Sequence, residues 1–305
     1  MTPRPAAGPA SLTDLPVPVL SVVRAGDRVL QIGPGPVAGA LCDRTRRPVA
    51  SVHATLGDVE AVRAPLGPHR RAAGVVDAVV GDLVEGRPDI GPADVILVTA
   101  AVTGLSPRWV DQLAPDGVII APLALGGLHP WVIVGRDVRD GLLYGCVLAV
   151  DPPGAGPRPA ADTRLYEARQ GLAEPDPAAP PRRAQPLPPC CTPERYVDLW
   201  AWLAGQDDRI TAASVRSLGW GPGCALTVGD STVHVRPDGL WLTDTEPVTL
   251  TLAQCVAQYV QAWASRRRPG ADEMTCRIGQ PPEAPADAPF VATGWTAGRP
   301  VTLPR

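Results

Sequence analysis

The sequence contains no lysine, so every basic side chain outside the few histidines is an arginine. The 28 arginines are nearly balanced by 31 acidic residues, which gives a net charge of −3 at pH 7. No excess of positive charge is therefore available to attract nucleic acid or an anionic bilayer. We expect neither nucleic acid nor membrane among the partners of this protein.

Long apolar stretches are also missing. No window holds the ~20 consecutive apolar residues that a membrane helix needs, and the proline-broken N-terminus has no apolar signal-peptide core. We expect a soluble, cytoplasmic protein. Neither the sequence pattern nor the charge predicts an oligomeric state.

The seven cysteines lack the even number and regular spacing of a disulfide framework. Cys190 and Cys191 are adjacent, but no further Cys or His lies at the spacing that would complete a metal site. We therefore expect reduced thiols and no bound metal.

Short apolar runs recur through the first half of the chain, as is typical of buried parallel strands. They occupy residues 28–33, 48–53, 75–80, 93–100, 117–122 and 131–135. Helix-like segments at 56–66 and 107–113 lie in the longer gaps. This alternation predicts an α/β fold with a doubly wound, mostly parallel, Rossmann-like sheet.

Composition divides the chain into three parts. Residues 1–150 carry the strand–helix alternation, and residues 151–193 are rich in Pro, Ala and Gly, as in an exposed, semi-rigid linker. Residues 194–305 hold two β-like runs around Gly229, which predict a hairpin, and helical periodicity at 251–265. We expect this third part to be a smaller α+β domain, separable from the first.

A Gly-Pro-Gly turn follows the first predicted strand. In doubly wound sheets the ligand lies beyond the carboxyl ends of the strands, where such a turn lets a cofactor approach the backbone. Gly33 and Gly35 supply unrestricted φ angles and bare N–H groups. The turn alone fits a methyltransferase, a dinucleotide-binding dehydrogenase or a purely structural bend.

A more specific pattern comes later in the first part. It consists of Val80-Gly81-Asp82-Leu83, then Ala93-Asp94-Val95-Ile96-Leu97-Val98-Thr99-Ala100-Ala101, then a run from Pro107 through Leu113 and Gly117 to Pro122. In this order the segments resemble the protein-L-isoaspartate O-methyltransferases, over residues 25–140. The resemblance implies a class I methyltransferase fold, S-adenosyl-L-methionine as cofactor, and a carboxylate of Asp or isoAsp in a protein as methyl acceptor.

The resemblance also implies roles for individual residues. Gly33 and Gly35 match the cofactor loop, and Asp82, after Gly81, matches the acidic residue that accepts a hydrogen bond from the adenine amino group. Thr99 matches the loop beside the cofactor and the methyl acceptor, so it is a candidate catalytic residue. Alternatively, Asp82 is a turn residue that satisfies local backbone N–H groups.

A second candidate catalytic residue, Ser11, precedes the first strand. The family has a substrate-capping serine in this region, and the segment is much shorter here. The alternative for Ser11 is an N-cap or loop hydroxyl.

Three positions depart from the family pattern. Gln31 stands where the family has Glu, Val37 replaces a third glycine, and His53 replaces the acidic residue that grips the ribose. A carboxylate accepts two ribose hydrogen bonds, whereas a neutral imidazole offers one acceptor and one donor, so we expect Gln31 and His53 to line a weaker cofactor site. The alternative for His53 is a strand-end histidine without a ligand.

The third part of the chain looks like the extra domain of related methyltransferases in peptide natural-product maturation systems. In those relatives the acceptor is an Asp carboxylate of a modified precursor peptide. Five tryptophans then form either a peptide-binding surface or part of a core: Trp200, Trp202, Trp220, Trp241 and Trp263.

Two functional hypotheses fit the sequence best. The first is a methyltransferase acting on a peptide carboxylate. The second is a degenerate methyltransferase fold that serves as a non-catalytic binding or scaffold partner, which the departures at Gln31, Val37 and His53 favour. A dehydrogenase is a distant third.

Overall fold

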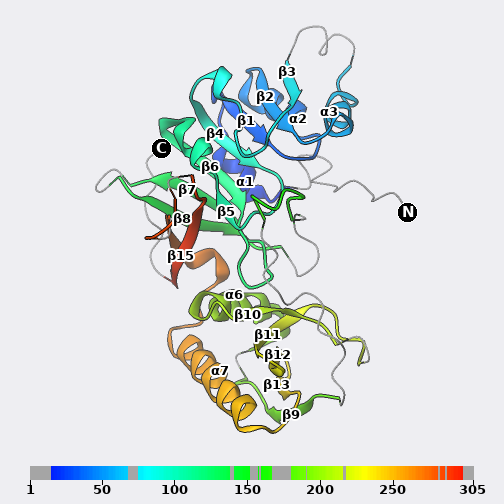
Figure 1. Cartoon of the computed structure of the whole chain (residues 1–305), viewed down its shortest axis with the longest axis vertical. Helices are drawn as coiled ribbons and strands as arrows, with labels where there is room; N and C mark the ends of the chain where they lie inside the picture. The colour runs from blue at the N-terminus through cyan, green and yellow to red at the C-terminus, as the bar shows by residue number, and fades with distance from the viewer. Residues whose placement is uncertain are drawn as a thin grey trace.

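The computed structural model describes residues 15–67, 75–137, 141–151, 157, 159–166, 180–189, 191–215, 218–280, 282–285 and 287–297. Ser11 and Cys190 lie outside the described residues. Two sheets organise the chain, the larger in the upper part of Figure 1 and the smaller in the lower part.

The larger sheet has ten strands in the order β3-β2-β1-β4-β6-β7-β8-β14-β15-β5. Their bounds are β1 Val29–Ile32, β2 Val49–His53, β3 Val76–Val80, β4 Ala93–Val98, β5 Gly104–Leu105, β6 Leu113–Pro122, β7 Trp131–Arg136, β8 Leu143–Ala149, β14 Met274–Gly279 and β15 Phe290–Ala297. All six strands expected in the first part are confirmed.

Strand direction corrects one expectation. The neighbours from β3 to β6 are parallel, whereas every pair from β6 to β5 is antiparallel. The sheet is thus mixed and only partly parallel, not mostly parallel. The reason is that β6, β7 and β8 follow one another through turns instead of crossover helices, which reverses the chain at each step.

Apolar residues on alternate strand positions cover both faces of this sheet. On one face, Val29, Val95 and Val118 pack with α1 (Val17–Val22), α2 (Ala38–Thr45) and α3 (Leu56–Arg63). On the other, Ile96 and Ile119 pack with α5 (Pro107–Asp111). Two-sided burial explains why these strands are continuous apolar runs.

The smaller sheet is antiparallel, in the order β10-β11-β12-β13-β9. The elements of this region are β9 Arg182–Gln185, α6 Tyr196–Gln206, β10 Ile210–Ala213, β11 Gly223–Val228, β12 Ser231–Arg236, β13 Gly239–Leu242 and α7 Pro247–Ser265. Short 3₁₀ helices are η2 Pro88–Ile90, η3 Pro193–Arg195 and η5 Ala271–Glu273. The predicted hairpin and the predicted helix at 251–265 are both confirmed.

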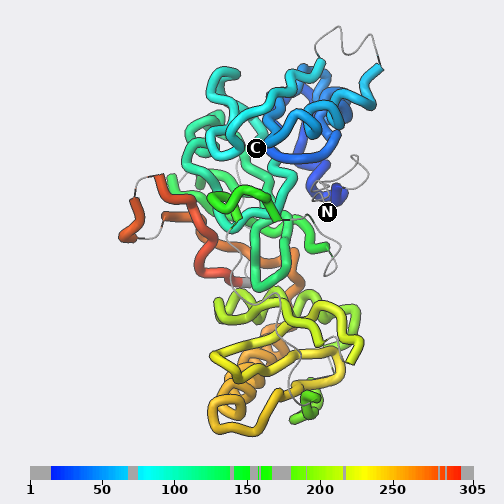
Figure 2. Tube along the Cα trace, turned by 45° about the vertical axis from the view of Figure 1, so that its right-hand side comes forward, coloured from blue at the N-terminus to red at the C-terminus, as the bar shows by residue number. Residues whose placement is uncertain are grey.

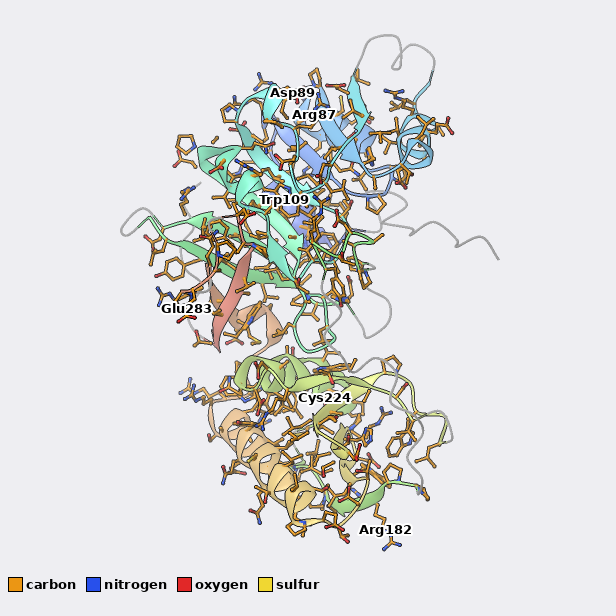
Figure 3. All side chains as sticks on the ribbon, viewed as in Figure 1. Arg87, Asp89, Trp109, Arg182, Cys224 and Glu283 are labelled. Carbon is orange, nitrogen blue, oxygen red and sulfur yellow. The ribbon has the colours of Figure 1, made fainter. Side chains whose placement is uncertain are left out.

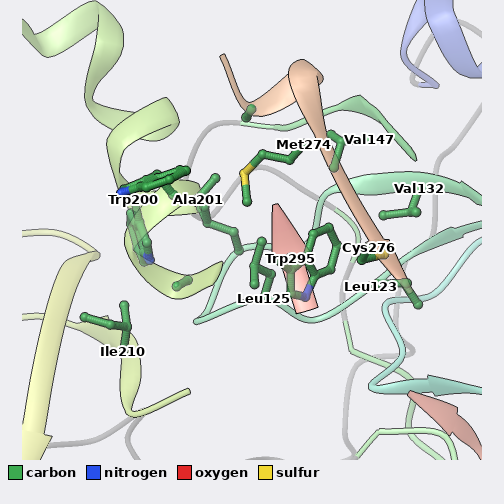
Figure 4. Packing of buried hydrophobic residues seen from close by; sticks show 14 of the residues in the cluster. Leu123, Leu125, Val132, Val147, Trp200, Ala201, Ile210, Met274, Cys276 and Trp295 are labelled. Carbon is green, nitrogen blue, oxygen red and sulfur yellow. The ribbon is translucent and has the colours of Figure 1, made fainter. Parts of the chain in front are cut away.

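The two sheets share one apolar core. Figure 4 shows Trp200 of α6 and Ile210 of β10 in the same packed cluster as Leu125, Val132 and Met274. The indole Nε1 of Trp200 donates to the Gly126 carbonyl at 2.8 Å, which fastens the turn after β6 to α6. The two parts therefore meet through an apolar contact with a hydrogen bond across it.

The chain also returns from the second part to the first. β14 pairs with β8, and Figure 2 shows this orange-to-red C-terminal segment beside the green strands of the larger sheet. β9 lies within the stretch expected to be a linker. The division at residues 150 and 193 stays a prediction, although strands from the third part complete the sheet of the first.

The tryptophans separate into two groups. Trp200, Trp202 and Trp263 are buried in the core, whereas Trp220 and Trp241 are half-buried on the smaller sheet. In the part of the chain that the structure describes, no helix is long and apolar enough to cross a bilayer.

Candidate functional site

The carboxyl ends of four parallel strands bring the predicted cofactor residues to one edge of the sheet. Ile32 is in register with both Val52 and Val98, so the residues that follow β1, β2 and β4 are neighbours. The Gly81 amide donates to the carbonyl of His53 at 3.0 Å, which adds the end of β3. The topology thus gathers residues that are up to 68 positions apart in the sequence, from Gln31 to Thr99.

The turn after β1 has a backbone that only glycine adopts without strain. Gly33 has φ of 103° and Gly35 has φ of 105°. A Cβ on Gly33 would lie 3.1 Å from the Thr99 hydroxyl oxygen and 3.5 Å from the Ala100 nitrogen. The third position of the family's glycine pattern, Val37, is buried in the core and precedes α2.

The side chain of Gln31 holds this turn through hydrogen bonds to its backbone. Its side chain is fully buried, and its Nε2 donates to the Gly35 carbonyl at 2.7 Å and to the Gly33 carbonyl at 3.3 Å. A glutamate could not donate these bonds, so the amide at position 31 suits the turn as it is built here. Its Oε1 is buried and has no partner among the described residues.

His53 ends β2 as a fully buried side chain. Its Nε2 lies 3.0 Å from the Ser51 hydroxyl, and its Nδ1 has no partner of normal hydrogen-bond geometry among the described residues. Burial lowers the pKa of His53, and this effect outweighs the opposite influence of Asp58 and of the Gly33 backbone. The ring is therefore neutral at pH 7 and lies against the turn. Its contact with a ribose stays a prediction.

Thr99 links the end of β4 to the same turn. Its buried hydroxyl donates to the Pro34 carbonyl at 2.6 Å and lies 3.2 Å from the Ile32 carbonyl oxygen. This geometry holds the Gly33–Gly35 turn in place. A catalytic role for Thr99 stays a prediction.

Asp82 follows β3 and makes two kinds of contact. One carboxylate oxygen accepts from the Val84 amide at 2.9 Å, as the turn interpretation of this residue expects. Both oxygens also accept from the guanidinium of Arg164, at 2.8 and 2.9 Å. The Arg164 bond is the largest of several causes that hold the pKa of Asp82 below its usual value. Sequence reasoning missed Arg164 because it lies in the Pro- and Ala-rich stretch and belongs to no motif.

The loop that carries Asp82 is clamped by α5 and the residue after it. Trp109, labelled in Figure 3, is fully buried and donates from its indole to the Leu83 carbonyl at 2.8 Å. Gln112 donates to the Glu85 carbonyl at 2.7 Å and accepts from the Arg87 amide at 2.7 Å. The loop therefore has a defined conformation, and Asp82 is presented from a fixed backbone.

Two exposed apolar side chains lie at or just beyond the carboxyl ends of β2 and β3. Leu56 begins α3 and is 63% exposed, and Val80 ends β3 and is 52% exposed. Val80 is in register with His53, so it stands at the same edge as the glycine turn. Large apolar side chains exposed beside a polar acceptor are what a flat aromatic ligand such as adenine would contact.

The profile of the protein-L-isoaspartate(D-aspartate) O-methyltransferase family matches residues 13–138 of this chain. Protein-L-isoaspartate O-methyltransferase 2 of Rhodopseudomonas palustris is 34% identical over 152 residues, which are 48% of this chain and 62% of that protein. The homologue from Azorhizobium caulinodans is 55% identical over 67 residues, 22% of this chain and 30% of the other. The chain thus spans less than two thirds of the length of these relatives.

Solved structures give weaker matches. A protein-L-isoaspartate O-methyltransferase structure aligns over 91% of this chain and 78% of its own, with 20% identity and a TM-score of 0.44. A homologue from Plasmodium falciparum in complex with S-adenosyl-L-homocysteine aligns over 47% of this chain and 70% of its own, with 15% identity and a TM-score of 0.40. The sequence matches carry the likeness: residues 13–138 are similar to the protein-L-isoaspartate O-methyltransferase family.

Proposed function

We propose that this protein is an S-adenosyl-L-methionine-dependent O-methyltransferase that acts on a carboxylate, of Asp or isoAsp, in a protein or a modified precursor peptide. The observation that carries the proposal is the turn at Gly33 and Gly35. Its left-handed backbone is held by Thr99 and Gln31, at the edge where parallel strands present a ligand.

The residues around this turn fit the cofactor. A bare glycine turn leaves room for a ligand to lie against the backbone. Two buried polar atoms beside it, Gln31 Oε1 and His53 Nδ1, lack a hydrogen-bond partner of normal geometry among the described residues. Buried polar atoms without partners are costly, and a ligand with hydroxyl or amino groups would offset that cost. The exposed side chains of Leu56 and Val80, just after β2 and at the end of β3, are available for apolar contacts with a ligand.

The chemistry asks little of the side chains. The bound cofactor supplies a methyl group that its sulfonium already activates. A carboxylate acceptor is ionised at neutral pH, so no general base is needed to prepare it. The protein's part is to orient the acceptor in line with the methyl group and to exclude water. A fixed backbone at Thr99, Ala100 and Ala101 is suited to that task.

A peptide acceptor is supported by the family description and by the smaller sheet. Trp220 and Trp241 lie there with ring centroids 5.1 Å apart, and the Arg236 guanidinium stands over Trp220 at 5.1 Å. Tryptophan and arginine are enriched among the residues that dominate binding energy at protein interfaces, so this group is available for a peptide. The link to precursor-peptide maturation stays a proposal.

A specific observation favours a second candidate, a non-catalytic binding partner. The two family carboxylates at positions 31 and 53 are replaced by buried neutral side chains, and the third carboxylate, Asp82, is held by Arg164. A fold that had lost its cofactor would tolerate all three changes.

Calorimetric titration of the full chain with S-adenosyl-L-homocysteine separates the two candidates. We expect saturable binding that Gly35→Val removes, because a branched side chain would strain the left-handed backbone and fill the space that the ligand needs. Gly229→Val is a matched control, since Gly229 also has positive φ, at 58°, and lies in an open hairpin turn. Absence of binding by the unmodified chain at millimolar ligand would favour the non-catalytic candidate.

If the ligand binds, a methyl-transfer assay tests the substrate. We expect transfer from labelled S-adenosyl-L-methionine to an isoAsp- or Asp-containing peptide, as a base-labile ester. Methylation of amino or ring-nitrogen groups in place of carboxylates would contradict the proposed acceptor.

A further inference from the structure

A short segment of the expected linker lies across the candidate site. We call residues 159–166 the strap. Pro159 forms a parallel bridge with Ala101, and the Ala160 amide donates to the Ala101 carbonyl at 2.8 Å. The Thr103 amide donates to the Leu165 carbonyl at 2.9 Å. The strap therefore runs along the loop that follows β4.

Side chains of the strap also hold it in place. Leu165 is buried in the core that lies between α5 and the larger sheet. The hydroxyl of Tyr166 lies 3.1 Å from His129 Nε2, in the loop after β6. A buried apolar anchor, a side-chain hydrogen bond and the backbone bonds together place Arg164 at a defined position, above the end of β3.

Arg164 bridges two carboxylates. It donates to both oxygens of Asp82, and it also donates to both oxygens of Asp162, through Nε at 3.0 Å and Nη2 at 2.6 Å. A carboxylate offers about four acceptor positions, and a guanidinium that meets it with two parallel bonds takes two of them. The Val84 amide takes a third position on Asp82, so an adenine amino group competes with Arg164 for a carboxylate that has few acceptor positions left.

We propose that Arg164 determines the affinity of the cofactor site, because its guanidinium occupies the carboxylate that would otherwise receive the adenine amino group. The inference rests on the proposed function, since it assumes that adenine binds at Asp82. The cofactor then binds fully only to those molecules in which Arg164 has left Asp82. The apparent dissociation constant equals the intrinsic dissociation constant divided by the fraction of such molecules.

The Arg164–Asp82 pair weakens cofactor binding but does not prevent it. The side chains of Arg164 and Asp82 are 58% and 38% exposed, and ion pairs of this exposure are weak. Asp162 keeps its own bonds to Arg164 when Asp82 is released, which further limits the cost of opening. From the usual strength of exposed pairs we expect a loss of affinity of about two- to fivefold.

Salt provides an independent readout. S-adenosyl-L-homocysteine carries no net charge at pH 7, so salt has little direct effect on its binding. Salt does screen an exposed Arg–Asp pair. In the unmodified protein, a rise in ionic strength should therefore release Asp82 and tighten binding, the opposite of the usual salt effect on a polar complex.

The experiment is calorimetric titration of S-adenosyl-L-homocysteine into the full chain and into Arg164→Ala, at low and at high salt. Arg164→Ala should bind about two- to fivefold more tightly at low salt and should lose the salt dependence. Arg28→Ala is the matched control, because Arg28 forms a similarly exposed pair with Asp94 at the opposite edge of the sheet. It should leave both the affinity and the salt response unchanged.

A double variant locates the effect. In an Asp82→Asn background, Arg164→Ala should change affinity little, because the competing pair is already gone. Equal or weaker binding by Arg164→Ala than by the unmodified chain would overturn the inference and leave the proposed function intact. Absence of binding in every variant would overturn the proposed function itself, and the inference with it.

Discussion

The hydroxyl of Thr99 lies 2.6 Å from the carbonyl oxygen of Pro34, across 65 positions of sequence. This bond connects the end of β4 to the turn after β1, so it fastens the two loops of the candidate site to each other. A buried hydroxyl that bonds to the backbone holds that backbone in position. Removing the Thr99 hydroxyl should therefore destabilise the conformation of the Gly33–Gly35 turn.

The first prediction tests that link. Thr99→Val keeps the volume of the side chain but removes the donor, so the Pro34 carbonyl loses its partner. We expect S-adenosyl-L-homocysteine binding to weaken by about 1 kcal/mol, with a similar loss in the free energy of unfolding. Thr99→Ser retains the hydroxyl and should preserve most of the affinity. Calorimetry and urea unfolding measure both effects; equal affinities of the Val and Ser variants would argue against a positioning role.

The second prediction concerns His53. A carboxylate at this position would be fully buried beside a neutral hydroxyl, with Asp58 close enough to influence it electrostatically. His53→Glu should therefore lower the free energy of unfolding by roughly 3 kcal/mol, the order found for an uncompensated buried charge. His53→Gln stays neutral and should cost less. If thermal unfolding shows the Glu variant to be as stable as the Gln variant, position 53 is open to solvent.

The third prediction concerns the contact between the two sheets. Gly127 has φ of 86°, and a Cβ there would collide with Ala212, whose nitrogen would be 2.6 Å away. Gly127→Ala should lower the free energy of unfolding by about 3 kcal/mol, through backbone strain and overpacking together.

Gly26→Ala separates these two causes. Gly26 has a similar φ of 93° and nothing within 4 Å of its Cβ position, so that variant should lose only about 1 kcal/mol. Equal losses measured by chemical unfolding would mean that the Gly127 turn does not pack on β10.

The fourth prediction concerns pH. Burial lowers the pKa of His129 to about 4 from an ordinary value of 6.5. Below pH 6.5, His129 is therefore protonated in the unfolded chain, whereas in the folded chain it becomes protonated only near pH 4. Stability is fully present above pH 6.5 and is lost as pH falls through this window, by on the order of 2 kcal/mol at pH 5. The lowered pKa of His53 acts in the same direction.

His129→Gln isolates this contribution. The glutamine can still bond to Tyr166, yet it does not titrate, so its stability should fall less steeply between pH 7 and pH 5. Melting temperatures across this range provide the measurement. Parallel curves for the variant and the unmodified chain would show that folding leaves the pKa of His129 unchanged.

The fifth prediction concerns separability. A chain ending at residue 151 lacks β14, which pairs with β8, and α6, which covers the turn after β6. The edge of β8 that truncation exposes carries buried apolar residues, so, in contrast to the separability that composition predicts, we expect aggregation or binding of hydrophobic dyes. Size-exclusion chromatography of the truncated chain measures this. A stable monomer that binds S-adenosyl-L-homocysteine would establish that the first part is an independent domain.

The sequence by itself determined the strands and the edge at which they end. Apolar runs and glycine positions are local signals, so β1 to β4 and the turn at Gly33 follow from them directly. A parallel arrangement then places Gly33, His53, Asp82 and Thr99 at one edge, because consecutive strand–helix units wind in a fixed hand. The family pattern is carried by these same residues.

Tertiary structure decided what each of these side chains contacts. Gln31 points under the turn, His53 is buried against Ser51, and Asp82 is held by Arg164. None of these contacts has a sequence signature, because each depends on which backbone groups a neighbouring segment leaves unpaired.

The two features that the sequence least predicts, the pairing of β14 with β8 and the strap, also depend on contacts between distant segments. β14 adds to β8 across 125 or more positions, where an unpaired edge strand and an uncovered apolar face required a partner. The strap is held in part by the single buried side chain of Leu165, too little to produce a periodic pattern. The periodicity of apolar residues predicts only which side chains are buried. Which segment covers them depends on how the whole chain packs into its core, and this is a property of the tertiary structure.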